Sequence, residues 1–193
     1  MKYVIMADGK GTRWNNFNEI PKHFIEIDGE RIIDRCVRLL KENDSGCEII
    51  ITSHDPRYDI PGTTRYEPLN NILEIDRFTS ELICDNICFM YGDTYYSENA
   101  IKTVTETPAE DILFFGNSRS IMAVKVTDGG LFRMHVDRVR KLYLEGKLKT
   151  CKGWQVYQSF TGLAPDTIGD NFVFIEDNSR DFNSPEDLIN PHQ

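Results

Sequence analysis

Long apolar runs are missing from this sequence. No stretch approaches the ~18 consecutive apolar residues that a membrane-spanning helix needs, so we expect no association with a membrane. The first residues, 1–6, form an apolar stretch that is too short for a secretory signal and lacks a small-residue cleavage site. We therefore expect a cytoplasmic protein.

Positive charge is also scarce. The sequence has 22 lysine and arginine residues against 31 aspartate and glutamate residues, and its formal net charge is -9. Proteins that bind DNA or RNA rely on many cations that neutralise phosphates, so this composition argues against a nucleic-acid polymer as partner. A small phosphorylated ligand remains compatible with it, because such a ligand needs few cations and often a metal held by carboxylates.

Cysteines are few and odd in number. No second pair stands at the spacing of a zinc site, and cytosolic proteins keep their thiols reduced, so we expect free and partly buried thiols. Two of them are four residues apart and would share a face if that segment were helical. The five cysteines are Cys36, Cys47, Cys84, Cys88 and Cys151.

Length and composition are those of an ordinary globular chain. With 193 residues, of which 40% are hydrophobic, the chain can bury a sizeable core within one domain. We find no internal repeat, low-complexity tract or linker. We therefore expect a single domain over residues 1–193, present as a monomer or a homodimer.

Short apolar runs alternate with segments of helical spacing. Runs rich in β-branched residues are typical of buried strands, and apolar residues three or four positions apart are typical of helices. The predicted strands are 3–6, 47–52, 86–91, 112–115, 121–126 and 172–175, the predicted helices are 32–40, 72–82, 97–104 and 130–145, and a last helix begins at Ser184. Residues 147–160 give no clear pattern.

This alternation predicts an α/β fold. Strands separated by helices form βαβ units, in which a mostly parallel sheet is covered on both faces. We expect a three-layer αβα, Rossmann-like fold with a mixed, mostly parallel sheet. Ligands of such sheets bind beyond the carboxyl ends of the strands. A glycine-rich turn after the first strand and Gly92-Asp93 after the third both lie at such ends.

The glycine-rich turn, Ala7-Asp8-Gly9-Lys10-Gly11-Thr12-Arg13, is suited to an anionic ligand. Glycines let successive N–H groups point into one concavity that binds phosphate oxygens, and an arginine adds a planar fork of donors. A plain turn with a solvent-facing arginine is the alternative. The turn is neither a Walker loop nor the dinucleotide fingerprint, whose third glycine is replaced by Trp14.

A longer motif resembles the signature of the nucleotidyltransferases. Gly9-Lys10-Gly11-Thr12-Arg13 is followed by Pro21-Lys22-His23-Phe24-Ile25-Glu26-Ile27-Asp28-Gly29, similar to that family's Gly-x-Gly-Thr-Arg and Pro-Lys-x-Leu segments. The family includes sugar-phosphate nucleotidyltransferases, phosphocholine cytidylyltransferases and molybdenum-cofactor guanylyltransferases. The resemblance implies a sheet of the glycosyltransferase-A type and transfer of a nucleoside monophosphate from a nucleoside triphosphate (NTP) to a small phosphorylated acceptor, with release of pyrophosphate.

The resemblance also implies roles for individual residues. Arg13 would stabilise the departing pyrophosphate, Lys22 would hold the α-phosphate, and Asn71 would lie near the base. The turn residues expected around the nucleotide are Ala7, Asp8, Gly9, Gly11 and Thr12. The family usually has a glycine where this chain has Asp8, whose side chain would crowd or repel a phosphate, or instead touch the base or the ribose.

Two carboxylates are candidates for binding Mg²⁺. Asp93 follows a glycine at the end of a predicted central strand, and Gly92-Asp93 resembles the step that supplies the family's metal-binding aspartate. Asp181, four residues before Pro185, matches the second ligand, with Asn183 and Asp177 in reserve. The alternatives are an ordinary turn aspartate and a solvated acidic loop.

The acceptor site is only loosely indicated. Residues 115–119, Lys125 and 152–154 carry cations and an aromatic ring that are compatible with an anionic acceptor such as a sugar phosphate or phosphocholine. His23 follows Lys22 and either faces the site or serves as a hydrogen-bonded structural residue.

Two other functions remain open. A small glycosyltransferase has the same type of sheet, but Asp93-Thr94-Tyr95 lacks the Asp-x-Asp such enzymes commonly use. A non-catalytic nucleotide-binding domain would keep the fold without turnover. Asp8 is the best argument for that function, and the cation and carboxylate set argues against it.

Overall fold

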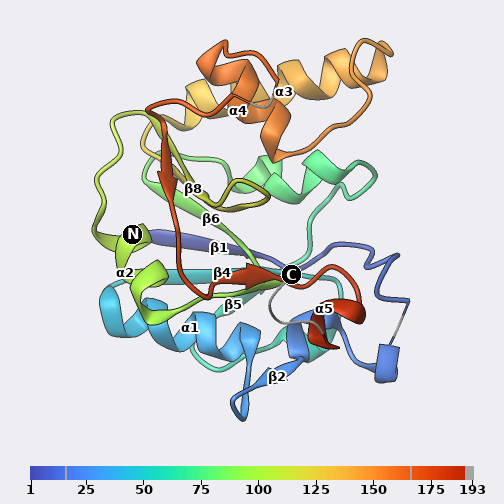
Figure 1. Cartoon of the computed structure of the whole chain (residues 1–193), viewed down its shortest axis with the longest axis vertical. Coiled ribbons are helices and arrows are strands. Elements are labelled where there is room, and N and C mark those ends of the chain that lie inside the picture. The colour runs from blue at the N-terminus through green and yellow to red at the C-terminus, as the bar shows by residue number, and fades with distance from the viewer. Residues whose placement is uncertain (16, 166, 190–193) are drawn as a thin grey trace.

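A seven-stranded sheet forms the centre of the computed structural model, which describes residues 1–15, 17–165 and 167–189 (Figure 1). From one edge to the other, the strands are β10 (Phe172–Phe174), β8 (Ile112–Gly116), β9 (Ile121–Val126), β6 (Ile87–Tyr91), β1 (Lys2–Met6), β4 (Glu48–Thr52) and β5 (Thr64–Tyr66). The predicted strands are therefore all present, and β5 is an addition.

Most neighbouring strands of the sheet are parallel. Only β9 is reversed, and it pairs antiparallel with both β6 and β8. β1 lies between β4 and β6. β4 and β5 extend the sheet on one side of β1, and the strands that follow in the sequence, from β6 on, extend it on the other side. The sheet is mixed and mostly parallel, as the sequence predicts, and its strand order changes direction at β1.

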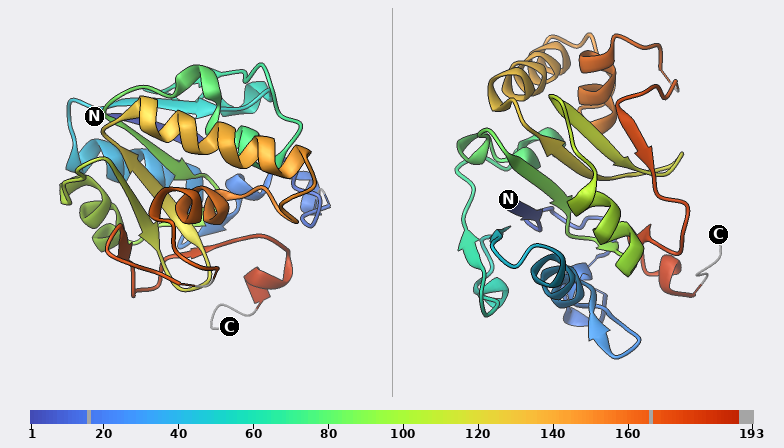
Figure 2. Two further views of the ribbon diagram at one scale, coloured as in Figure 1. Left: turned by 90° about the horizontal axis from the view of Figure 1, so that it is seen from above. Right: turned by 90° about the vertical axis from the view of Figure 1, so that its left-hand side faces the viewer.

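Helices cover both faces of the sheet (Figure 2). The α-helices are α1 (Ile32–Asn43), α2 (Glu98–Glu106), α3 (Gly129–Leu144), α4 (Gly153–Thr161) and α5 (Glu186–Ile189). Successive side chains of a strand point to opposite faces. Accordingly, Tyr3 and Ile5 pack in one core cluster with α1 and α2, and Val4 and Met6 pack in another with α3 and α4. These two cores confirm the predicted three-layer αβα fold.

Small elements surround the sheet. A hairpin joins β2 (Glu26–Ile27) and β3 (Glu30–Arg31), and β7 (Thr94–Tyr95) pairs antiparallel with β11 (Arg180–Asp181). Short 3₁₀ helices cover Phe17–Glu19 (η1), Lys22–Phe24 (η2), Pro56–Tyr58 (η3), Glu74–Phe78 (η4) and Ser80–Leu82 (η5). The β7–β11 pair brings residues 85 and 87 positions apart in the sequence side by side.

The predicted amphipathic helix over residues 72–82 is wrong. Two 3₁₀ helices, η4 and η5, occupy this segment, and Thr79 between them has a positive φ of 39°. The Asp76 carboxylate accepts hydrogen bonds from the backbone N–H groups of Ile72 and Leu73 and binds Arg140 of α3. The apolar spacing is real, since Ile75 and Phe78 are buried, but a kinked segment satisfies it as well as a helix would.

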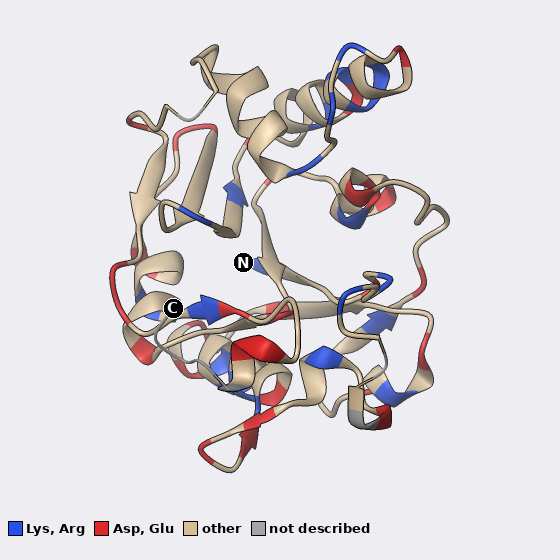
Figure 3. Cartoon of the chain, turned by 45° about the vertical axis from the view of Figure 1, so that its right-hand side comes forward, with Lys and Arg blue, Asp and Glu red and all other residues tan. Residues whose placement is uncertain are grey.

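Other expectations can be compared with the structure. All five cysteines are free, and Cys88 lies in β6, so it shares no helical face with Cys84. The segment without a clear pattern contains α4. Acidic and basic residues are interspersed along the ribbon, and the β2–β3 hairpin is mostly acidic (Figure 3). Among the described residues, no helix has the length and apolar character needed to cross a bilayer.

Candidate active site

Four parallel strands end at the same edge of the sheet and carry the candidate site there. The glycine-rich turn follows β1, Asp93 follows β6, and the segments after β4 and β5 contain His54 and Asn71. Because β1 is the strand at which the sheet order changes direction, a crevice opens beyond its carboxyl end.

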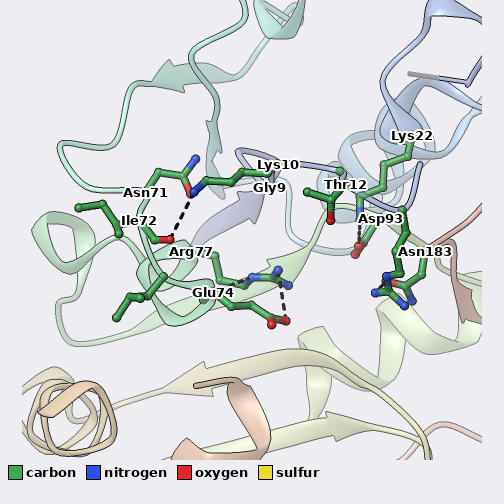
Figure 4. Close-up of a pocket in the computed structure, with 13 residues that line it drawn as sticks. Gly9, Lys10, Thr12, Lys22, Asn71, Ile72, Glu74, Arg77, Asp93 and Asn183 are labelled. Carbon is green, nitrogen blue, oxygen red and sulfur yellow. Dashed lines mark hydrogen bonds and ion pairs between the residues drawn. The ribbon is translucent and has the colours of Figure 1, made fainter. Parts of the chain in front are cut away.

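A cavity of about 280 Å³ lies at this edge (Figure 4). We call it the glycine-turn cavity. Its lining combines backbone from the turn with cationic, amide and carboxylate side chains, namely Gly9, Lys10, Gly11, Thr12, Arg13, Lys22, Asn71, Ile72, Leu73, Glu74, Arg77, Asp93 and Asn183. The structure therefore brings together most of the sequence-predicted site residues, and adds Lys10, Glu74 and Arg77.

Trp14 anchors the glycine-rich turn. Its indole is buried beside Ile25 and Phe182, and its Nε1 donates to the carbonyl of Ile20 at 3.0 Å. Gly11 has a φ of +54°, and its carbonyl accepts the backbone N–H of Trp14 at 2.9 Å. The residue that breaks the dinucleotide fingerprint thus holds the turn against a small core, and the glycines stay exposed to the cavity.

Lys22 and Asp93 form an ion pair in the wall of the cavity. Both side chains are largely buried, with exposed fractions of 12% and 10%. Burial alone would raise the pKa of the Asp93 carboxyl, but the ammonium of Lys22 and other nearby cations outweigh burial and hold this pKa below its usual range. Asp93 is therefore a carboxylate at neutral pH, and it is available to bind a cation.

Asp181 reaches the same region through the β7–β11 pair. The backbone N–H of Phe182 donates to the carbonyl of Asp93 at 2.8 Å, and Asp93 and Asp181 line one hollow of about 110 Å³ next to the glycine-turn cavity. We call it the acceptor hollow, after the role that we propose for it. The Asp181 carboxylate accepts hydrogen bonds from Ser120 Oγ at 3.0 Å and from the Asn183 amide, whose Oδ1 binds Arg13 at 2.8 Å.

The carboxylates of Asp93 and Asp181, which line the acceptor hollow, are ligands of the kind that Mg²⁺ uses. Among the residues that the structure describes, no group of three or more histidine, cysteine, aspartate or glutamate side chains is placed to hold a metal. Mg²⁺ commonly uses one or two carboxylates, with water and substrate phosphates completing its coordination. Asp93 and Asp181 supply two. Asp177, a reserve candidate, instead accepts a hydrogen bond from Ser97 at 2.6 Å, at the start of α2 and outside the glycine-turn cavity and the acceptor hollow.

Several candidates lie elsewhere. Ala7 and Asp8 line a neighbouring hollow on the far side of the turn. The prediction that Lys125 contacts the acceptor is wrong, because this residue is buried in β9 and its ammonium donates to the carbonyls of Thr105 and Thr107. The ring of Trp154 stacks on Phe172 at 5.5 Å, although its edge lines the acceptor hollow with Lys152 and Arg119.

His23 is a structural residue in the core behind the site. Its Nδ1 lies 2.6 Å from the hydroxyl of Tyr58, and only 3% of the residue is exposed. Burial, and after it the ammonium of Lys22, lowers the pKa of His23 to about 3, against an opposing effect of Asp93. The imidazole is therefore neutral in the folded protein at neutral pH.

This histidine should make stability sensitive to mild acid. Since its pKa is lower in the folded than in the unfolded protein, its contribution is complete above about pH 6.5 and is lost as pH falls toward 3. We expect the free energy of unfolding to drop by at most about 1.4 kcal/mol per pH unit in that window. Urea unfolding at pH 7.5, 6.5 and 5.5 should show a shallower dependence for His23→Gln, and equal slopes would contradict this account.

Gly92 leaves no room for a side chain next to Asp93. A Cβ atom at this position would lie 2.9 Å from the carbonyl oxygen of Met6 and 3.2 Å from the His23 ring. We expect Gly92→Ala to destabilise the protein by about 1–3 kcal/mol, because backbone must move. Urea unfolding measures this loss, and Gly9→Ala is the matched control, since a Cβ there meets nothing within 4 Å.

Solved structures place this fold among known proteins. The chain is similar to the CTP:phosphocholine cytidylyltransferase LicC from Streptococcus pneumoniae, with 15% sequence identity, a TM-score of 0.58, and coverage of 97% of this chain and 96% of that one. It is also similar to the inositol-1-phosphate CTP transferase from T. maritima, with 13% identity, a TM-score of 0.61, and coverage of 97% and 91%.

A third similar structure is a nucleoside-diphosphate-sugar pyrophosphorylase from Vibrio cholerae RC9, with 10% identity, a TM-score of 0.62, and coverage of 98% of each chain. No family model matches the chain, and no curated protein matches it. The similarity therefore rests on structure alone, and it covers nearly the whole length of this chain and of each of the three similar proteins. The chain has the fold of the nucleotidyltransferases.

Proposed function

We propose that the protein is a Mg²⁺-dependent nucleotidyltransferase that transfers a nucleoside monophosphate from an NTP to a small phosphorylated acceptor. One observation carries this proposal: the glycine-rich turn, Arg13, Lys22 and the ionised Asp93 line the same cavity. A binding site for a triphosphate needs such a combination of backbone N–H groups and cations, and transfer needs a metal-binding carboxylate beside them.

The proposed reaction joins two anions. An oxygen of the acceptor phosphate attacks the α-phosphorus of the NTP, the bond from that phosphorus to the bridging oxygen breaks, and pyrophosphate leaves with the electron pair. The acceptor phosphate already carries negative charge, so no side chain has to remove a proton. The protein contributes alignment of the reactants and neutralisation of charge, which supply most of the catalysis in phosphoryl-type transfer.

Individual residues have distinct proposed roles. Lys22 would hold the α-phosphate, and Arg13 would stabilise the charge that develops on pyrophosphate. Asp93 and Asp181 would hold Mg²⁺, which supplies charge neutralisation when bound. The backbone of Gly9 and Gly11 would contact phosphate oxygens closely, since neither glycine has a Cβ.

The proposed acceptor occupies the acceptor hollow. This hollow shares Glu74, Arg77, Asp93 and Asn183 with the glycine-turn cavity, so a group bound there lies next to the α-phosphate position. Arg119 and Lys152, which also line it, provide cations for an acceptor phosphate. A sugar phosphate and a phosphocholine-like compound are both candidates.

A thermal-shift panel of ATP, GTP, CTP and UTP, each with and without Mg²⁺, tests the donor. A ligand at a hundred times its dissociation constant stabilises a protein by about 2.7 kcal/mol, so a true donor should raise the melting temperature clearly, and more with the metal. Pyrophosphate release with sugar 1-phosphates or phosphocholine then identifies the acceptor.

The same panel separates the alternatives. Stabilisation by nucleotide-sugars but by no triphosphate would indicate a glycosyltransferase. Triphosphate binding that is equally tight with and without Mg²⁺, together with no release of pyrophosphate in the presence of any acceptor, would indicate a non-catalytic nucleotide-binding domain. Either result would contradict the proposed transfer reaction.

A further inference from the structure

Asp8 connects the ends of three neighbouring strands. It follows β1, and its Oδ1 accepts the backbone N–H of His54, after β4, at 3.0 Å. Its Oδ2 lies 2.9 Å from Nδ1 of the same histidine. On the other side, Nδ2 of Asn71, after β5, donates to both the carbonyl oxygen and Oδ2 of Asp8, at 2.5 and 2.8 Å. The carboxylate is 12% exposed, and Asp8 does not line the glycine-turn cavity.

These contacts determine which way the amide of Asn71 points. An amide nitrogen carries two hydrogens, and both are used on Asp8. The amide oxygen is then the polar atom that Asn71 can offer to the glycine-turn cavity, which it lines. None of the residues that the structure describes donates a hydrogen bond to this oxygen. Asn71 therefore presents an acceptor, and a ligand must bring the donor.

The distribution of charge in the cavity indicates which part of a nucleotide meets Asn71. Lys22 and Asp93 lie at one end beside Asn183, to which Arg13 is hydrogen-bonded, and phosphates and Mg²⁺ would bind there (Figure 4). At the other end lie Asn71 and Ile72 (Figure 4), and Leu73, next to Ile72 in the sequence, also lines the cavity. Of the two other cations that line the cavity, Arg77 pairs with Glu74 at 3.5 Å, and the ammonium of Lys10 donates to the carbonyl of Ile72 at 3.4 Å. A neutral, partly apolar group fits there, and in an NTP that group is the base.

We infer that Asp8 is a positioning residue for donor selection: it fixes Asn71 with its carbonyl oxygen toward the base, and so selects a base with an amino group at C4 of a pyrimidine or C6 of a purine. This inference rests on the proposed function. The relevant difference lies at one ring position, because CTP and ATP carry an amino donor where UTP and inosine triphosphate (ITP) carry a carbonyl acceptor. A carbonyl facing Asn71 would leave two acceptors against each other without a donor.

The test compares dissociation constants within two matched pairs, CTP against UTP and ATP against ITP, for the wild-type protein with Mg²⁺. We expect the amino-bearing partner to bind about tenfold more tightly in whichever pair binds, the equivalent of one hydrogen bond. Equal binding, or a preference for the carbonyl-bearing partner, would overturn the inference. Failure of all four triphosphates to bind would instead remove the proposed function.

Variants then assign the selectivity to the contact between Asp8 and Asn71. Asn71→Ala should bring the ratio close to one. Asp8→Ala should lower it several-fold, because the amide keeps only its bond to the main-chain carbonyl, and the double variant should lower it no further than Asn71→Ala. An unchanged ratio in Asp8→Ala, or additive effects of the two changes, would overturn the inference.

Two further variants keep this test independent of folding. Asp8→Asn preserves the size of the side chain but leaves a single acceptor oxygen for the donors of His54 and Asn71, so it should also lower the ratio. His54→Ala removes one partner of Asp8 and leaves both bonds to Asn71, so its ratio should remain that of the wild type. A loss of stability alone would alter binding of both nucleotides and leave their ratio unchanged.

Discussion

The Asp93→Asn variant should lose turnover by about a thousandfold or more, the equivalent of about 4 kcal/mol of transition-state stabilisation. Asparagine keeps the shape of the side chain but removes the charge that would hold Mg²⁺ between the phosphates. Asp93 is a suitable ligand in the structure because it is nearly buried, ion-paired with Lys22, and kept ionised by a lowered pKa. The rate of pyrophosphate release at saturating NTP, acceptor and Mg²⁺ measures the effect.

Folding has to be separated from catalysis in this experiment. Removing the charge of Asp93 leaves the largely buried ammonium of Lys22 without its partner, and such a loss is destabilising. The double variant Lys22→Met with Asp93→Asn removes both charges and should recover stability without recovering turnover. An Asp93→Asn enzyme that retains metal-dependent activity within about tenfold of the wild type would show that Asp93 is not a metal ligand.

Arg13→Ala should lower kcat/KM by a factor of about a hundred to a thousand, comparable to the removal of one group that stabilises transition-state charge. The side chain of Arg13 is exposed at the mouth of the cavity, and its hydrogen bond to Asn183 at 2.8 Å turns the guanidinium toward the Asp181 side. Because little packing is lost, the free energy of unfolding should change by no more than about 0.5 kcal/mol. Steady-state kinetics and urea unfolding together check both statements.

Matched variants sharpen the result for Arg13. Arg13→Lys keeps the charge but not the planar fork, so its kcat/KM should fall between those of the wild type and of Arg13→Ala. Arg138→Ala removes an exposed arginine from α3 and should leave the kinetics unchanged. Equal kinetic losses in Arg13→Ala and Arg138→Ala would point to an effect of overall charge instead of a specific role.

The sequence predicts the sheet well because burial on both faces leaves a plain signal. β6 and β8 are continuous apolar runs, and each has the length of a single strand. The segment 72–82 misleads because its apolar spacing describes which side chains are buried and not the path of the backbone. The path is determined by the positive φ of Thr79 and by the long-range bond from Arg140 to Asp76, neither of which periodicity contains.

The candidate site likewise contains residues whose placement the sequence predicts and residues whose placement it does not. Arg13, Lys22, Asn71 and Asp93 meet in one cavity because each stands at or shortly beyond the carboxyl end of a parallel strand or in the adjoining loop, a placement that strand order alone makes predictable. Asp181 reaches the site through an antiparallel pair that no local pattern signals. The direction of the Asp8 side chain depends on His54 and Asn71, which come together only once β4 and β5 lie beside β1.

The arrangement of the candidate site also depends on the short β7–β11 pair. The main sheet and the cores on its two faces are complete without β11, yet Asp181 and Asn183 are held in place by a ladder of two residues on each strand, the small core around Phe182, and single hydrogen bonds from Ser120 and Arg13. So small a unit can open without global unfolding and at a lower free energy. Heat, mild denaturant or a protease that acts near residue 180 should therefore switch turnover off before the spectroscopic melting of the sheet begins, and the amide hydrogens of β11 should exchange well ahead of those of β1.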